Sequence, residues 1–426
     1  MNSALHRTFK VVNLGCKLNF AEASTIAREL TNLGFTQADD GNTADICVVN
    51  TCAVTEQAEK KCRQAIRKIA KDDGNITICI TGCYASIKPF ELEQMPEVSM
   101  VADKADIVKK IGEHFSLSGA GCPVATENFF PACSFDDRTR SFLKVQDGCD
   151  YHCSYCTVPL ARGASRNMAI EELVKQAETI AAHGVKEVVI TGVNIGDFGK
   201  STGENFFHLA QALEQVQGID RYRISSIEPN LLTEELIDFV AKSQKFLPHF
   251  HIPLQAGTNR ILGLMHRRYT RELFAEKLKS IRDKMPLAFI GVDVIAGFPT
   301  EADEEFEDCY NFLQGLAPSY LHVFPYSKRP NTPAFDMKQV ATKTIAGRAK
   351  RLGELCNTLH QDFYRKNVGQ SRQVLFESAK RSGRMFGFTD NYIKVAMPYD
   401  GKLVNAIAKV KLQETDEQGN MKGTLI

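Results

Sequence analysis

The chain has 426 residues, which is long for one domain and sufficient for two or three. Its 52 Lys and Arg residues nearly balance 51 Asp and Glu residues, so no overall basic field marks it as a nucleic-acid-binding protein. Thirteen cysteines, an odd number in so long a chain, exclude a small disulfide scaffold and suggest metal ligation in a reducing compartment. No apolar run could cross a membrane and the N-terminus resembles no secretory segment, so we expect a soluble, cytoplasmic protein.

Residues 7–117 are predicted to form an open parallel α/β sheet. The β-branched runs in FKVVNLGC, DICVVNTC and NITICITGC alternate with stretches of helical period, as in βαβ units. Each run ends at a small polar turn and a cysteine, namely Cys16, Cys52 and Cys83. Because the carboxyl ends of parallel strands lie along one edge of a sheet, these three thiols should converge there.

Residues 118–138 are predicted to be a linker, because they are rich in Gly and Pro and have no periodicity. We interpret Cys122 and Cys133 as solvent-tolerant linker cysteines. The cysteines inside apolar runs and amphipathic helices should be core residues, namely Cys47, Cys79, Cys309 and Cys356. Cys62, on a charged helix, has the best claim among the remaining thiols to reactivity.

Residues 139–366 contain six strand-like runs, each followed by a helix, which predicts a partial (βα)6 barrel of TIM type. Polar and glycine residues follow the strands, at the edge where barrels hold their active sites: Asn194, Glu228, Gln255 and Gly297. His249 and His251 alternate on the fourth strand, so one of them should face the interior with a polar partner. The loop after the first strand, GCDYHCSYC, spaces Cys149, Cys153 and Cys156 as C-x3-C-x2-C.

Residues 367–426 are predicted to form a small antiparallel β-barrel, because alternating apolar and polar runs are separated by turns. Within RSGRMFGFTDNYIK, aromatic residues that include Phe388 and Tyr392 lie among cations. Rings interleaved with basic residues can stack on RNA bases. The same pattern also suits rings in a core beneath a solvated surface, and the sequence leaves both readings open.

Three thiols supply only three of the four ligands that a tetrahedral metal ion or a 4Fe–4S cluster takes. Zinc would take His152 as its fourth ligand, but neighbouring His and Cys side chains point apart on most backbones and no second C-x2-C hairpin exists. An iron–sulfur cube would keep one iron without a thiolate. An open metal position is useful where a substrate or cofactor must bind the metal, so the second reading favours an enzyme.

The C-x3-C-x2-C loop resembles the signature of the radical S-adenosylmethionine (SAM) enzymes. An α/β domain, a six-unit barrel and a terminal β-domain in this order, with the motifs NLGCKLN, NTCAVT and TGCYA, resemble the methylthiotransferases of that superfamily over essentially the whole chain. The resemblance implies that Cys149, Cys153 and Cys156 hold a 4Fe–4S cluster whose open iron binds SAM. It also implies an auxiliary 4Fe–4S cluster on Cys16, Cys52 and Cys83, and a terminal segment similar to the RNA-holding TRAM domain.

Within this family, NTCAVTEQAEKKCRQAIRK and HVFPYSKRPNTPA look most like the MtaB type. That type adds a 2-methylthio group to N6-threonylcarbamoyladenosine at position 37, beside the tRNA anticodon, and spends two SAM molecules. The alternatives are the MiaB type, which acts on dimethylallyl-adenosine, and the RimO type, which acts on a ribosomal-protein aspartate. A zinc-stapled RNA-binding protein without catalysis is the alternative from a different class.

The resemblance also assigns residues and partners. The residues predicted to contact SAM are Tyr155, Thr191, Gly192, Asn194, Ser226, Glu228 and Gly297, the last by letting the backbone approach the adenine closely. Side-chain chemistry, and not the resemblance, predicts the residues that contact RNA, which are Arg162, Arg166, Arg267, Arg268, Phe388 and Tyr392. No side chain is assigned to the chemical step, which belongs to a radical derived from SAM. The expected partners are the anticodon stem-loop of tRNA and an electron donor such as flavodoxin or ferredoxin, and we expect a monomer.

Overall fold

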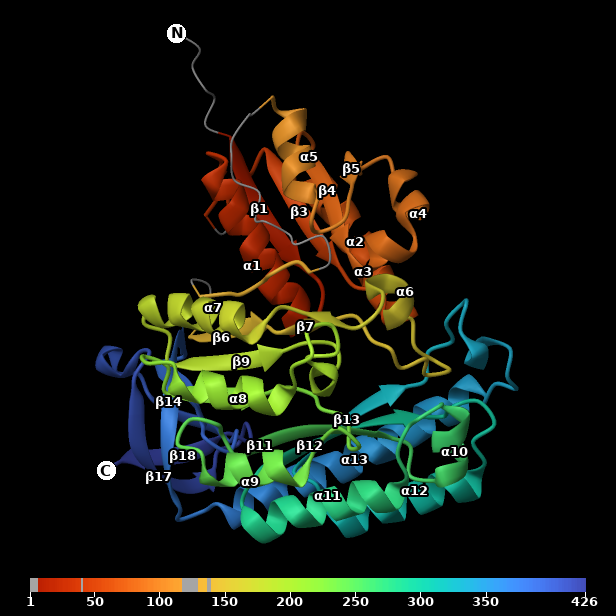
Figure 1. Cartoon of the computed structure of the whole chain (residues 1–426), viewed down its shortest axis with the longest axis vertical. Helices are drawn as coiled ribbons and strands as arrows, with labels where there is room; N and C mark the ends of the chain where they lie inside the picture. The colour runs from red at the N-terminus through yellow and green to blue at the C-terminus, as the bar shows by residue number, and fades with distance from the viewer. Residues whose placement is uncertain (1–6, 40, 117–128, 136–138) are drawn as a thin grey trace.

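The computed structural model describes residues 7–39, 41–116, 129–135 and 139–426. In Figure 1 an N-terminal α/β part lies above a central barrel, and a small β-barrel formed by the C-terminal residues flanks the central barrel. Among the described residues, no helix combines the length and the apolar character that crossing a membrane requires.

The N-terminal part is the predicted open parallel sheet, with five strands in the order β2-β1-β3-β4-β5. The three predicted strand runs are β1, β3 and β4, while the two-residue edge strands β2 and β5 were not foreseen. The strands are β1 (Thr8–Asn13), β2 (Thr36–Gln37), β3 (Ile46–Thr51), β4 (Thr77–Gly82) and β5 (Met100–Val101). The helices are α1 (Lys17–Asn32), α2 (Glu56–Asp72), α3 (Cys83–Ile87), α4 (Pro89–Glu93) and α5 (Ile107–His114).

The central part has the six predicted parallel strands in chain order, which confirms the partial barrel. Its strands form two sheets, β6-β9-β10 and β11-β12-β13, joined by parallel bridges from Tyr222 to Phe246 and from Ser226 to His251. The strands are β6 (Arg140–Lys144), β9 (Glu187–Thr191), β10 (Arg221–Ile224), β11 (His249–Gln255), β12 (Phe289–Ala296) and β13 (Tyr320–Pro325).

Helices cover the outer face of this barrel (Figure 1). Apolar side chains of the strands and of these helices pack together in one buried core, so one face of each strand is turned outward, toward the helices. The helices are α6 (Val158–Arg162), α7 (Ile170–Ala182), α8 (Phe206–Gln215), α9 (Glu234–Lys242), α10 (Asn259–Leu264), α11 (Arg271–Lys284), α12 (Asp303–Leu316) and α13 (Thr342–Lys366). A short hairpin, β7 (Gln146–Asp147) with β8 (Arg166–Asn167), brackets the cysteine loop.

The C-terminal part is a closed five-stranded barrel in the order β14-β15-β16-β18-β17. The prediction of a purely antiparallel barrel was wrong in one pairing, because β16 and β18 run parallel. Strands β15 and β18 were not foreseen as strands; β15 contains Phe388. The strands are β14 (Ser371–Arg381), β15 (Arg384–Thr389), β16 (Lys394–Pro398), β17 (Ile407–Thr415) and β18 (Met421–Leu425).

Part of the predicted linker packs against the central barrel. Cys133 is buried, forms a bridge with Leu143 of β6, and accepts hydrogen bonds at its carbonyl oxygen from Thr25 and Arg28. The interpretation of Cys133 as a solvent-tolerant cysteine was therefore wrong, because the residue is sandwiched between α1 and β6. Cys122 lies outside the described residues.

Candidate active site between the N-terminal sheet and the central barrel

The three N-terminal cysteines lie at the carboxyl edge of three neighbouring strands. Cys16 is the N-cap of α1, Cys52 follows β3 directly, and Cys83 begins α3 after β4. Strand β3 lies between β1 and β4, so the three strand ends are adjacent. Burial raises the pKa of the Cys52 thiol to about 11, and the neighbouring Cys83 and Cys16 thiols add to this shift. The trio predicted from the sequence is thus brought together.

Two buried asparagines hold the turns that carry these cysteines. Asn19 donates to Asn50 Oδ1 at 3.0 Å, and Asn50 returns a hydrogen bond to the Asn19 carbonyl at 2.8 Å. Asn19 Oδ1 accepts from the Cys16 thiol at 3.2 Å. A Cβ atom at Gly82 would lie 2.4 Å from Asn50 Oδ1, so only glycine lets the chain turn into Cys83 at this place.

The second trio lies in the loop after β7, at the carboxyl edge of the barrel. Gly148 turns the chain with φ +71°, and a Cβ there would lie 1.9 Å from the Ala164 carbonyl oxygen. The Cys149 amide donates to the Gly163 carbonyl at 3.0 Å, which closes the loop. Ser154 anchors the middle of the loop through its amide to Met265 and its hydroxyl to Leu264. Burial raises the pKa of the Cys149 thiol to about 11 and that of Cys156 to about 12, and the neighbouring thiols of the trio add to both shifts.

Gln146 joins the cysteine loop to the loop after β9. Its Oε1 accepts the amides of Val193 and Asn194, both at 2.9 Å, and its Nε2 donates to the Gly148 carbonyl at 2.7 Å. Because Gln146 is fully buried, this link is held away from water. It fixes the TGVN segment, which is predicted to contact SAM, relative to the cysteine trio.

Neither trio has the dimensions of a single-ion site. Ligand atoms around one tetrahedral zinc ion lie about 3.5–4 Å apart, given zinc–sulfur bonds of ~2.3 Å. Among the described residues, only His251, Asp293 and His322 bring three metal-type ligand atoms to within 4.8 Å of one another. His152 is exposed, and its carbonyl oxygen is hydrogen-bonded to His266 Nδ1, so its environment does not support a role as a fourth ligand. Wider trios of soft thiols fit an iron–sulfur cluster, which is larger than one ion.

The predicted SAM-contacting residues lie around the second trio. Asn194 is buried, donates to Asp197, and has an Oδ1 atom without a hydrogen-bond partner within the described structure. An unpaired buried acceptor of this kind suits the ammonium group of a bound amino acid. Tyr155 meets the ring of Phe298 edge-on at 6.3 Å. Thr191 ends β9 and accepts the Val145 amide at its carbonyl oxygen.

Other predicted contacts have protein partners. Ser226 forms the bridge to His251 that joins the two sheets. Glu228 is paired with Arg267. A Cβ at Gly297 would lie 2.5 Å from Ile345 Cγ1, so packing against α13 already requires a glycine there, and the approach of its backbone to adenine stays a prediction. Gly192 has little free space as well, because a Cβ would lie 2.9 Å from Ile195 Cγ2.

The arginines predicted to meet RNA divide into buried and accessible ones. Arg267 is nearly inaccessible; it donates to Cys153 Sγ at 3.0 Å, to Tyr269 and to Glu228. Its guanidinium is thus committed to the cysteine loop, and the prediction that it meets RNA was wrong. Arg268, one residue later, is exposed, lies over the Tyr151 ring at 4.1 Å and can still meet a phosphate. Arg166 is partly exposed and contacts Asp147.

Arg162 is also buried, so it is not the accessible cation that was predicted. It pairs with Glu22 and Asp147 at 3.0 and 2.9 Å, and it donates to Asn19 Oδ1 at 3.1 Å. That oxygen also accepts the Cys16 thiol, so Arg162 joins the segment after the cysteine loop to the N-terminal trio. Lys104 and Lys144 contact the same two carboxylates at 2.7–2.8 Å.

Sequence reasoning missed this ion network, which joins the N-terminal sheet to the central barrel. The cations hold the pKa of Glu22 and Asp147 below the usual range of carboxyl groups, although burial acts in the opposite direction. Burial lowers the pKa of Lys144 to about 8. A lysine in the apolar run FLKV was the available signal, because a strand charge that faces inward needs partners.

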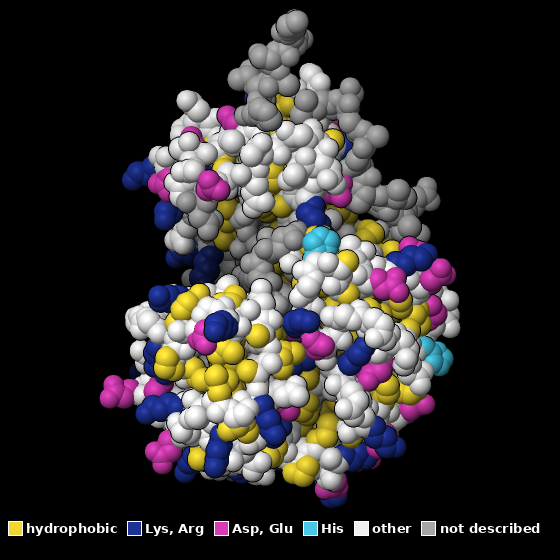
Figure 2. Space-filling view, turned by 90° about the vertical axis from the view of Figure 1, so that its left-hand side faces the viewer, with side chains coloured by type: hydrophobic (Ala, Val, Ile, Leu, Met, Phe, Trp, Pro, Cys, Tyr) yellow, Lys and Arg dark blue, Asp and Glu magenta, His cyan; other side chains and the backbone are white. Residues whose placement is uncertain are grey.

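Phe388 and Tyr392 lie where the C-terminal barrel meets the central one. Their rings stack at 5.0 Å, and Tyr392 also meets His249 at 4.8 Å. Arg223 lies 4.8 Å from the Tyr392 ring, and Arg140 lies 4.6 Å from that of Phe388. Both rings are partly buried by protein, so of the two readings that the sequence left open, the structure favours packing over exposed stacking platforms. In Figure 2 the cations on the visible face are interspersed with carboxylates and form no continuous basic field.

Comparisons with known proteins agree with this arrangement. The Radical SAM superfamily model matches residues 143–313, and the model described as uncharacterized protein family UPF0004 matches residues 8–103. A Bacillus subtilis protein named threonylcarbamoyladenosine tRNA methylthiotransferase MtaB is 37% identical and covers 94% of this chain and 92% of its own. A Carboxydothermus hydrogenoformans tRNA-2-methylthio-N(6)-dimethylallyladenosine synthase is 29% identical over 96% of this chain and 97% of its own.

Among solved structures, the radical SAM methyltransferase TsrM of Kitasatospora setae superposes with a TM-score of 0.54 at 16% identity, covering 78% of this chain and 77% of its own. That likeness shows the fold. The sequence match over nearly the whole length shows more: the chain belongs to the radical SAM methylthiotransferase family and is a transferase.

Proposed function

We propose that this protein adds a methylthio group to carbon 2 of N6-threonylcarbamoyladenosine at position 37 of tRNA, with two 4Fe–4S clusters and two SAM molecules. The observation that carries the proposal is the pairing of two incomplete thiol trios across one interface. Asn19 Oδ1 contacts both the Cys16 thiol and Arg162, which follows the Cys149–Cys156 loop in α6. A sulfur donor on one side and a radical source on the other would face a common substrate.

The clusters would supply the chemistry that no side chain offers, namely a SAM-derived radical at one trio and a transferable sulfur at the other. An adenine C–H bond is too weakly acidic for a general base, so the proposal assigns this step to the SAM-derived radical and to no side chain. The chain's own residues hold and orient: Gln146 fixes the TGVN loop against the cysteine loop. Asn194 offers an unpaired acceptor to the SAM amino group.

The choice of substrate rests on relatives and local features. The MtaB-named relative is 37% identical, against 29% for the dimethylallyladenosine synthase. Arg268 is an exposed cation beside the cysteine loop, suited to a phosphate of the anticodon stem-loop. We place the electron donor, a flavodoxin or ferredoxin, and a monomeric state in the same proposal, together with an RNA-holding role for residues 367–426.

Nucleoside analysis by mass spectrometry tests the substrate directly. A strain that lacks this protein should lose the 2-methylthio form of N6-threonylcarbamoyladenosine and accumulate the precursor, and a plasmid copy should restore it. Loss of the methylthio dimethylallyl nucleoside instead would assign the chain to the MiaB type. Intact tRNA nucleosides together with an unmodified ribosomal-protein aspartate would assign it to the RimO type.

Metal analysis of protein purified without oxygen tests the class. Two full clusters give a brown protein with about eight irons per chain. A colourless protein loaded with zinc would overturn the enzymatic assignment and favour an RNA-binding protein.

A further inference from the structure

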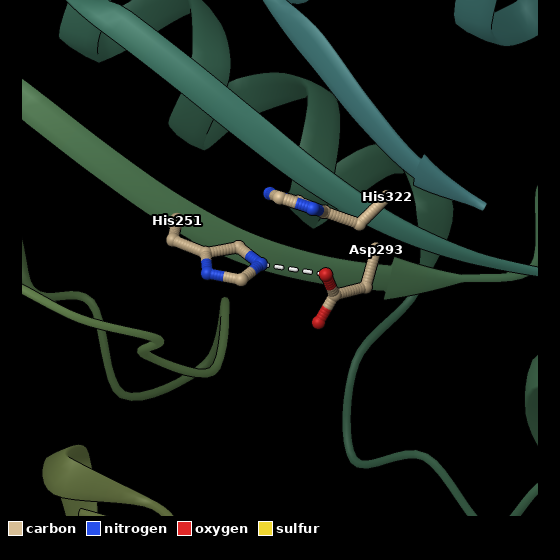
Figure 3. Close-up of side chains that lie close together, drawn as sticks. All are labelled: His251, Asp293 and His322. Atoms are coloured by element: carbon tan, nitrogen blue, oxygen red, sulfur yellow. Dashed lines mark hydrogen bonds and ion pairs between the residues drawn. The ribbon is translucent and has the colours of Figure 1, made fainter. Parts of the chain in front are cut away.

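Three polar side chains extend from neighbouring strands on the inner face of the barrel: His251 of β11, Asp293 of β12 and His322 of β13 (Figure 3). Asp293 and His322 are direct partners in the β12–β13 register. In most barrels of this type, branched apolar side chains fill the interior. A polar group at this depth calls for a polar partner.

The alternation of side chains along these strands fixes the direction in which the three point. Their sequence neighbours Ile252, Val292 and Leu321 belong to the apolar core that the strands share with the outer helices. Side chains one position away lie on the opposite face of a strand. His251, Asp293 and His322 therefore face the lumen, and each is only partly buried.

The three are arranged for hydrogen bonding more than for a metal ion. His251 Nε2 donates to Asp293 Oδ1 at 2.6 Å, and the rings of His251 and His322 lie 4.7 Å apart. Two ligands of one metal ion, each at about 2.1 Å, are separated by roughly 3 Å or more. The His251–Asp293 contact is shorter than this, and it leaves the second Asp293 oxygen and the His322 ring facing the lumen.

The cluster lies near the loop of the second cysteine trio. Ser226 pairs with His251 in a β-bridge, and Glu228, two residues later, is paired with Arg267, which contacts Cys153. Burial raises the pKa of Glu228, and the charge of Asp293 adds to this rise, so Asp293 lies near the Glu228–Arg267 pair that contacts Cys153. Burial and His251 lower the pKa of His322, and Lys17, the neighbour of Cys16, acts in the same direction.

We propose that His251, Asp293 and His322 form a lumenal subsite for the polar N6 substituent of the substrate adenosine, a urea that carries a hydroxy acid. The inference rests on the proposed function and assigns its specificity to these residues. The His322 ring and the second Asp293 oxygen match the hydroxyl group of the hydroxy acid, which can accept a hydrogen bond from the ring and donate one to the carboxylate. Among the residues described near the cluster, Lys17 offers the cation for its carboxylate. An apolar dimethylallyl group would leave these polar groups unpaired, which is how a hydrogen-bonding pocket rejects an analogue.

A cycle of enzyme and substrate truncations tests the subsite in the reconstituted holoenzyme. The substrates are two anticodon stem-loop RNAs, one with the threonylcarbamoyl group and one with an N6-methylcarbamoyl group, which keeps the urea but lacks the hydroxy acid. On the first RNA, kcat/KM should fall about 10- to 100-fold in His322→Gln and in Asp293→Asn, the range expected when a buried polar partner is lost. On the second RNA, wild type and variants should differ less than threefold, because the contact is already absent.

Further readouts separate a specificity role from a structural one. Iron content, uncoupled SAM cleavage and the melting temperature should stay as in wild type, and His208→Ala, an exposed histidine of α8, should behave as wild type on both RNAs. Equal losses on the two RNAs would overturn this inference while leaving the proposed function intact. Stoichiometric Mn²⁺ binding, seen by EPR and lost in His322→Gln, would replace the subsite with a cation site. A wild-type enzyme active only on dimethylallyl RNA would overturn both proposals.

Discussion

At the scale of single residues, two neighbouring arginines have opposite environments. Arg267 is inaccessible and bound to Cys153 and Glu228, whereas Arg268 is exposed and lies over Tyr151. The motif HRRYTRE does not distinguish them, because a pair of adjacent cations reads as one basic patch. Only the packing of the loop after α10 against the cysteine loop separates their roles.

Substituting these two arginines one at a time should give opposite effects on tRNA binding and on SAM cleavage. Arg268→Ala should weaken tRNA binding and reduce the slope of log affinity against log salt by about one, because one phosphate contact is lost. It should leave uncoupled SAM cleavage unchanged. Arg267→Gln should leave tRNA binding and its salt dependence unchanged. It should reduce SAM cleavage at least ~10-fold, because Glu228 loses its counter-ion and Cys153 Sγ loses a hydrogen-bond donor. Salt-dependent binding and 5′-deoxyadenosine release measure the two effects, and identical behaviour of the variants would contradict the division.

His322 predicts a pH dependence of stability. Burial and the nearby His251 lower its pKa to about 4 from 6.5, with Lys17 acting in the same direction and Asp293 in the opposite one. The unfolded chain therefore binds the proton more tightly, and the free energy of unfolding should fall as the pH drops below 6.5. Between pH 7.5 and 6.0, this group contributes a loss of about 0.8 kcal/mol. Denaturant titrations of wild type and His322→Gln at both pH values should show a smaller loss in the variant; equal losses would mean that His322 is protonated in the fold.

At the scale of elements, the cysteine loop depends on one backbone conformation. Gly148 has a positive φ and no space for a Cβ against the Ala164 carbonyl. Gly148→Ala should therefore displace Cys149 and remove about four irons together with SAM cleavage. Gly263→Ala in α10 is the control: nothing lies within 4 Å of its Cβ position, so iron content should hold and stability should stay level or rise by about 0.5 kcal/mol. Iron assay and thermal melting read out both, and a brown, active Gly148→Ala enzyme would contradict this account of the loop.

The elements themselves were largely predictable from the sequence. Strands β1, β3 and β4 and the six barrel strands follow from β-branched runs bounded by turns. The N-terminal cysteine trio follows from the rule that strand ends share an edge, and the second trio follows from its local C-x3-C-x2-C spacing. The parallel pairing of β16 with β18 was not predictable, because register in a small barrel depends on closure. Tertiary pairing also decided Arg162 and Arg267, whose partners Glu22 and Glu228 are 140 and 39 residues distant.

At the scale of the whole molecule, buried charges hold the N-terminal sheet against the barrel. Glu22 of α1 and Asp147 of β7 share Lys104, Lys144 and Arg162, with nitrogen–oxygen distances of 2.7–3.0 Å. Removing one member of such a network leaves an unpaired buried charge, at a cost of about 3–5 kcal/mol. The network thus holds the N-terminal sheet, with its cysteine trio, in a fixed position on the barrel that carries the second trio.

The division of labour between the trios gives the last prediction. Replacing Cys16, Cys52 and Cys83 with Ala should leave about four irons per chain and intact SAM cleavage, but abolish methylthio transfer. The matched control replaces Cys47 and Cys79, two buried thiols of the same domain. Burial raises the pKa of both thiols to about 12, so they act as small apolar side chains. That control should keep about eight irons and full turnover, at a moderate loss of stability. If the triple variant transferred methylthio groups, the auxiliary trio would be structural and a single cluster would have to perform the whole reaction.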